Sequence, residues 1–192
     1  MQPLQPTINK ENVPYASFTE RLLAYFIDVA LFLPLTAIEA YNTNWWKRID
    51  IMLLCILVWS IYKPLMEWKF GGTLGKKIMQ IRVVNYDYEA INFNQAMLRF
   101  SVFFARNLAQ AITYIKLFMH PAFAAFHFES MEDLNELILL QEDNPDPTSS
   151  IVLFFLLFSV TRIIFDPERQ AHHDKIARTY CIKTNSKKRV TK

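Results

Sequence analysis

The chain has 192 residues, of which 52% are hydrophobic, and it contains 16 phenylalanines but only 3 glycines. The apolar residues fall in long blocks, which is typical of a membrane protein and argues against an ordinary soluble domain. The formal net charge is only +3, and the two cysteines, Cys55 and Cys181, offer no disulfide framework.

The first apolar segment, about residues 17–38, is predicted to be a transmembrane helix that follows a polar cytoplasmic arm at residues 1–16. Ser17 and Glu20 have the spacing of a capping box. Arg21 and Asp28 are seven residues apart, about two helical turns, so their side chains leave the helix on nearly the same side. A carboxylate inside a membrane helix costs roughly 3 kcal/mol, so we expect Asp28 to have a partner from elsewhere in the chain.

A second transmembrane helix is predicted at about residues 45–66, and a polar loop follows it. Five lysines and arginines lie between Lys63 and Arg82, with Glu67 as the only acid among them. This excess of basic residues indicates that the loop is cytoplasmic. Within it, the alternating apolar residues of IMQIRVVN and the following AINF predict a small β-hairpin.

The third predicted helix, about residues 95–119, carries polar residues at helical spacing, a stripe that we expect to face other helices. The stripe consists of Arg99, Arg106, Gln110 and Thr113. The acidic segment 120–147 contains no lysine or arginine and is predicted to lie outside the cell. A fourth helix at about residues 148–165 then returns the chain, the transmembrane domain ends at residue 182, and residues 183–192 form a basic cytoplasmic tail. Both termini are therefore expected in the cytoplasm.

Three sequence blocks together resemble the RDD family of membrane proteins, which is named for one arginine and two aspartates. They are YASFTERLLAYFID, GGTLGKKIMQIRVV and AHHDKIARTYCI. The resemblance assigns the arginine to Arg21 and the two aspartates to Asp28 and Asp174. It implies a location in a bacterial inner membrane and suggests transport. The chain departs from the family pattern at Arg178, where a small residue is common, and in its long acidic segment.

The depths of the charged residues suggest a network in two layers. Counted from the cytoplasmic ends of their helices, Asp28 and Arg106 both lie about 15 Å deep. Arg21 and Arg99 lie at one shallow level, near the expected position of Asp174 and Asp166. We therefore expect a deep pair of Asp28 with Arg106, and a shallow group in which the two other arginines contact the carboxylates. Such charges can form an ion pathway or simply fix helix packing, and the sequence supports both equally.

Other motifs exclude several kinds of site. Gly71 to Lys77 lacks the residues of a phosphate-binding loop, so Lys76 and Lys77 are expected to contact anionic lipid headgroups. His172, His173 and Asp174 lack metal-ligand spacing, and no nucleophile accompanies the histidines. We expect neither an enzyme nor a metal or cofactor site. The basic tail is interpreted as an orientation signal, and no nucleic acid is expected as a partner.

The sequence thus predicts an all-α integral membrane four-helix bundle with a small cytoplasmic β-hairpin between helices two and three. One possible function is a small ion or solute transporter component, with Asp28 as the protonatable or cation-binding group and Arg106 and Arg21 tuning it. So small a bundle would need to form a homo-oligomer or bind a membrane protein partner. The other is a non-transporting scaffold or accessory subunit in which the same charges hold the helices together.

Overall fold

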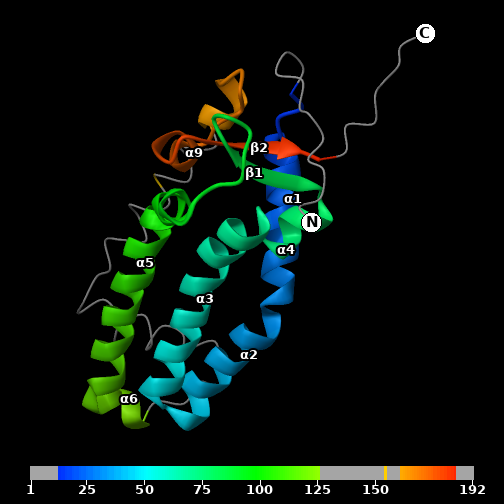
Figure 1. The fold of residues 1–192 in the computed structure, drawn as a ribbon. Coiled ribbons are helices and arrows are strands. Elements are labelled where there is room, and N and C mark those ends of the chain that lie inside the picture. Colours follow the sequence, from blue (N-terminus) through cyan, green and yellow to red (C-terminus); the bar gives the residue numbers. More distant parts are fainter. Residues whose placement is uncertain (1–12, 126–153, 155–160, 185–192) are drawn as a thin grey trace.

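The computed structural model of the chain describes residues 13–125, 154 and 161–184. Three predictions fall largely outside these residues: the acidic segment beyond residue 125, the fourth helix before residue 161, and the outer parts of the arm and tail. The described chain is mostly helical, and a two-stranded sheet covers one end of the long helices (Figure 1).

The first predicted helix consists of two helices with a sharp bend between them. α1 spans Phe18–Leu31, α2 spans Leu33–Tyr41, and the two segments meet at an angle of 49°. Pro34 in the first turn of α2 explains the break, because proline lacks an N–H and its ring clashes with the preceding helical turn. The predicted capping box is present: Ser17 Oγ accepts from the Glu20 N–H, and Glu20 Oε2 accepts from the Ser17 N–H.

The second predicted helix starts and ends later than expected. A π-helical turn, η2, covers Asn42–Trp46, and α3 spans Ile49–Phe70. Asn42 fixes the connection between them, since its buried side chain both accepts from the Arg48 N–H and donates to the Arg48 carbonyl. Gly71 ends α3 with a φ of 72°, a left-handed conformation that glycine adopts without strain.

One described stretch, Ile49–Ile78, is apolar and long enough to cross a membrane, with a mean hydropathy of 1.8. The bent pair of α1 with α2 and η2 passes the same test as a single unit. α5, Phe93–Met119, packs against α3 and carries charged residues along its length. Large apolar side chains such as Leu54, Ile61 and Phe104 are exposed on these helices, as lipid-facing residues are. The described residues thus contain one or two clear spans rather than a confirmed four-helix bundle.

The predicted β-hairpin is wrong in its second strand. β1, Ile81–Asn85, forms as expected, but it pairs antiparallel with β2, Thr179–Lys183, from the far end of the chain. Only an isolated bridge between Val84 and Ala90 remains of the expected pairing. The physical reason is that Asn92 and Gln95 form a reciprocal capping box that already starts α5, leaving no residues for a second strand.

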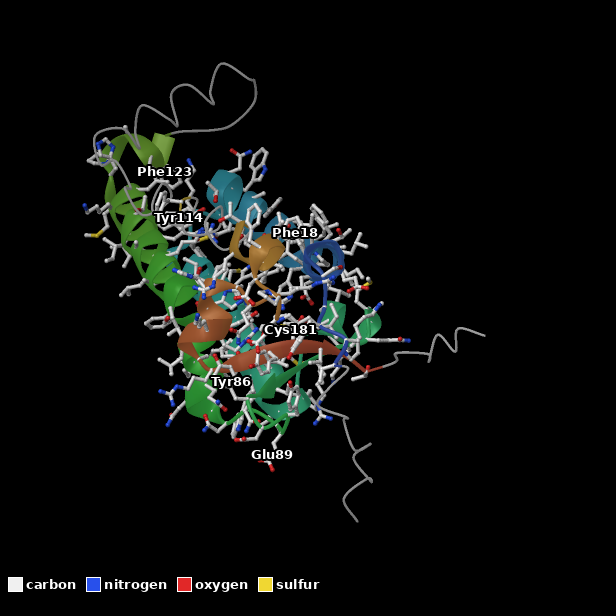
Figure 2. All side chains as sticks on the ribbon, turned by 90° about the horizontal axis from the view of Figure 1, so that it is seen from above. Phe18, Tyr86, Glu89, Tyr114, Phe123 and Cys181 are labelled. Atoms are coloured by element: carbon white, nitrogen blue, oxygen red, sulfur yellow. The ribbon has the colours of Figure 1, made fainter. Side chains whose placement is uncertain are left out.

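The other edge of β2 is covered by the segment before α1. The Ala16 N–H donates to the Cys181 carbonyl and the Lys183 N–H donates to the Pro14 carbonyl, both at 2.9 Å. An apolar core lies where the sheet meets the helices, formed by Ala16, Ala24, Ile81, Val83, Ile91, Ala96 and Cys181. Figure 2 looks down on this end, and Cys181 lies near the middle of the view.

The short helix α4, Leu74–Ile78, packs directly on α1 through Gly75. A Cβ at Gly75 would lie 2.0 Å from the Ala24 carbonyl oxygen, so alanine there would push the two helices apart.

We expect Gly75→Ala to destabilise the protein by about 1–3 kcal/mol, the usual cost of overpacking. Thermal unfolding in detergent measures this loss. Gly72→Ala is the matched control, because its Cβ would meet the nearest atom at 3.2 Å. Equal losses of stability in the two variants would contradict this close approach.

Candidate functional site

Asp174 and Arg21 join the end of the chain to α1. Asp174 lies in the short helix α9, His172–Ile176, and is fully buried. Its Oδ2 accepts from Arg21 Nη1 at 2.5 Å and from the Ala171 N–H at 3.1 Å. Arg21 also donates to the backbone carbonyls of Arg169 and Ala16. One guanidinium therefore holds α1 to α9 and to the segment that precedes α9.

Arg99 of α5 is also fully buried and contacts three further elements. Its Nε donates to Glu67 Oε2 of α3 at 2.8 Å, and its Nη1 lies 2.6 Å from Asp174 Oδ1 of α9. Nη1 donates to the hydroxyl of Thr179 in β2, which in turn donates to the Asp174 carbonyl. The side chain thus links both long helices to the segment that covers them.

Glu67 completes this group and was missed as a site residue by the sequence analysis. It is 1% exposed, and its Oε1 lies 2.5 Å from Lys76 Nζ. The one available signal was its position as the only acid in a basic stretch of chain. Lys76, predicted to contact lipid headgroups, instead uses its ammonium group inside the protein. We call Arg21, Glu67, Lys76, Arg99 and Asp174 the charge cluster.

The charge cluster sets the protonation state of Asp174, and burial sets that of the neighbouring His173. Burial alone would raise the pKa of Asp174, but the positive charges of Arg99 and then Arg21 outweigh it and hold that pKa well below its usual range. His173 Nε2 lies 3.2 Å from Asp174 Oδ1. Burial lowers the pKa of His173 to about 3, against the opposing pull of Asp174. At neutral pH Asp174 is therefore ionised and His173 is neutral.

Asp28 lies apart from the charge cluster and has no cationic partner among the described residues. Its Oδ1 accepts from the Tyr62 hydroxyl at 2.9 Å and from the Gly75 N–H at 2.8 Å. The Tyr62 oxygen in turn accepts from the Leu74 N–H. The predicted pair of Asp28 with Arg106 does not form, because Asp28 faces α3 and α4 while Arg106 is exposed on α5.

The predicted polar stripe of α5 is only partly directed at other helices. Arg99 is buried, but at the level of Arg106 the contact with α3 comes from Asn107, which donates to Ser60 Oγ at 2.8 Å. The Thr113 hydroxyl bonds within its own helix, to the Ala109 carbonyl. The shallow carboxylate Asp166 approaches Arg162, at 3.8 Å, rather than Arg21 or Arg99. Of the predicted network, the structure therefore brings together Arg21, Arg99 and Asp174.

The remaining predicted site residues have simple environments. Lys77 is exposed, and its ammonium lies 4.2 Å from the centroid of the Phe70 ring. Within the described part of the chain, no three histidine, cysteine, aspartate or glutamate side chains gather in a way that could hold a metal ion.

The described residues thus combine one or two helices that are apolar and long enough to cross a membrane with a buried charge cluster at one end. A protein-family model described as the RDD family matches residues 15–178, most of the chain, so the chain belongs to the RDD family. Arg21, Asp28 and Asp174 all fall within the matched region. The searches of curated proteins and of solved structures each returned no match.

Removing one carboxylate of the charge cluster should cost far more stability than removing an exposed one. We expect Asp174→Asn or Glu67→Gln to destabilise the protein by about 3–5 kcal/mol, because each leaves a buried cation without its partner. The control is Asp50→Asn, since the Asp50–Arg48 pair is largely exposed and should contribute far less to stability. Thermal unfolding in detergent measures the difference, and a comparable loss in all three variants would contradict a special role for burial.

The depressed pKa of His173 predicts a loss of stability in acid. Between its unfolded pKa of 6.5 and its folded pKa of about 3, the unfolded chain binds the proton more strongly than the folded one. The contribution of His173 to stability is therefore complete above pH 6.5 and is lost as the pH falls toward 3. We expect His173→Gln to flatten the pH dependence of the melting temperature in this window. His120→Gln, at an exposed histidine, should leave the dependence unchanged, and a flat wild-type profile would disprove the expectation.

Proposed function

We propose that this protein is a small transporter component that uses Asp28 to bind a proton or a cation. The observation that carries the proposal is the contrast between its acids. Glu67 and Asp174 contact two cationic side chains each, whereas within the described part of the chain Asp28 accepts only from a tyrosine hydroxyl and a backbone N–H. A half-buried carboxylate with neutral donors keeps its charge uncompensated, so it is free to exchange a proton or a cation.

The backbone next to Asp28 supports the same proposal. α1 ends at Leu31, one turn beyond Asp28, and the following helix departs at an angle. Interrupted helices are a common way for transporters to bring backbone groups to an ion site inside the membrane. The charge cluster would then be the fixed part of the protein, and the region around the break between α1 and α2 would bind the proton or cation.

The proposal includes an orientation and a location. Exposed basic residues gather at the end that carries the sheet, namely Lys69, Lys77, Arg169, Lys175 and Arg178. By the positive-inside rule this end is proposed to face the cytoplasm, together with both termini, in a bacterial inner membrane. Lys77 is the better placed of the two predicted lysines to contact anionic headgroups. The protein is proposed to act without a cofactor and not as an enzyme, as a homo-oligomer or with a membrane protein partner.

A second function is favoured by the charge cluster itself. Every member of the cluster has an oppositely charged partner within the described protein. Permanently paired charges favour a scaffold or accessory subunit in which the charged side chains only hold the helices together. The two functions differ in what they require of Asp28, since a scaffold needs its hydrogen bonds but not its negative charge.

Ion flux in proteoliposomes separates these functions. We expect the purified wild-type protein to conduct protons or a monovalent cation, and Asp28→Asn to abolish this flux. Asparagine retains an oxygen that accepts from Tyr62 and Gly75, so this variant should fold and insert like the wild type. Asp50→Asn is the control, because it removes an exposed carboxylate at the other end of the helices and should leave the flux unchanged. Absence of flux from the wild type, or full flux from Asp28→Asn, would overturn the transport proposal.

A further inference from the structure

A lysine next to the charge cluster has no acidic partner of its own among the described residues. Lys63 lies on α3, one turn before Glu67, and is partly buried. Its ammonium lies 4.1 Å from the centroid of the Phe103 ring on α5. Within the described chain, no carboxylate lies within ion-pairing distance of this group. The ring covers one side of the ammonium and offers it only a weak cation–π contact.

The charges around Lys63 do not balance. With Lys63 included, four cations surround the two carboxylates Glu67 and Asp174, the other cations being Arg21, Lys76 and Arg99. Counted over the described residues, this leaves an excess of two positive charges at a largely buried site. The nearby His173 is uncharged at neutral pH. An excess of buried charge is costly unless a counterion compensates it.

We propose that Lys63 binds an anionic phosphate or carboxylate group at the seam between α3 and α5. Two interhelical contacts bound the site, Glu67 with Arg99 on one side and Ser60 with Asn107 on the other. The Phe103 ring lines the site beside the Lys63 ammonium.

The depth of Lys63 fits an anion that arrives from the cytoplasmic surface. Lys63 lies seven residues before the end of α3, about 10 Å along the helix. This depth is within reach of the phosphate of a lipid headgroup and also of a free anion from solution. Both sources offer the same chemistry to the ammonium, and neither depends on whether the protein transports ions.

The test measures whether anions stabilise the protein through Lys63. The full chain is placed in phosphatidylcholine nanodiscs in a chloride buffer, and its melting temperature is compared in three conditions. These are the plain discs, discs that also contain phosphatidylglycerol, and plain discs with added inorganic phosphate. A ligand that binds only the folded state raises the melting temperature as its concentration increases. Stabilisation by phosphatidylglycerol alone identifies a headgroup, and stabilisation by inorganic phosphate identifies a free anion.

Substitutions of two lysines on α3 make the test specific. We expect Lys63→Gln to weaken the apparent affinity for the stabilising anion about tenfold or more, the usual effect of losing a charged hydrogen bond. Lys63→Arg retains the charge and should retain the response. Lys69→Gln is the matched control, because Lys69 is exposed on the same helix and also lies over an aromatic ring, that of Trp68. It should respond like the wild type.

Three results would overturn the proposal. One is a wild-type melting temperature that is the same in all three conditions, a measurement that needs no variant to fold. The second is a Lys63→Gln variant that responds to anions as the wild type does. The third is a Lys69→Gln variant that loses the response as completely as Lys63→Gln, which would show a general surface effect.

Discussion

The structure depends on the burial of one guanidinium. Arg99 is placed on a long helix where no water reaches it, and a permanent charge with five N–H groups must find acceptors there. The fork of its side chain points in several directions, so its partners come from several elements. A glutamate of α3 and a hydroxyl of β2 accept its hydrogen bonds, and an aspartate of α9 forms an ion pair with it. Because those groups must surround Arg99 at the same time, the small sheet and α9 can occupy only one position on the helices.

The sequence predicted the residues of this arrangement better than their partners. Counting residues from the ends of the helices correctly placed Arg21 and Arg99 level with Asp174, because the rise per residue in a helix is constant. The same count failed for Asp28 and Arg106, because depth does not determine the direction in which a side chain points. The short helix α4, which the sequence analysis treated as loop and strand, supplies the N–H group that Asp28 accepts.

The partner of β1 could not be predicted from its own segment of the sequence, for a different reason. β1 was identified from its alternating apolar residues, but its partner lies almost a hundred residues away, and no property of β1 itself indicates it. The sequence analysis chose the nearest apolar segment, AINF, as the partner strand. Two of its four residues instead form the N-cap and the first residue of α5. Glu67 was overlooked similarly, since its importance follows from Arg99 on another helix. Both errors concern contacts between distant parts of the chain, which sequence patterns within one segment do not encode.

The pairing of Pro14, Ala16 and β1 with the last described strand has a consequence for how the protein is made. Synthesis proceeds from the N-terminus, so α1, α3 and α5 are complete while Asp174, Thr179 and Cys181 are still inside the ribosome. During that interval Arg21 and Arg99 lack an acceptor that they have in the finished protein. A chain that stops short of α9 therefore retains two arginines that lack these acceptors. α9 and β2 thus complete, late in synthesis, the pairing of charged side chains on helices that are made earlier.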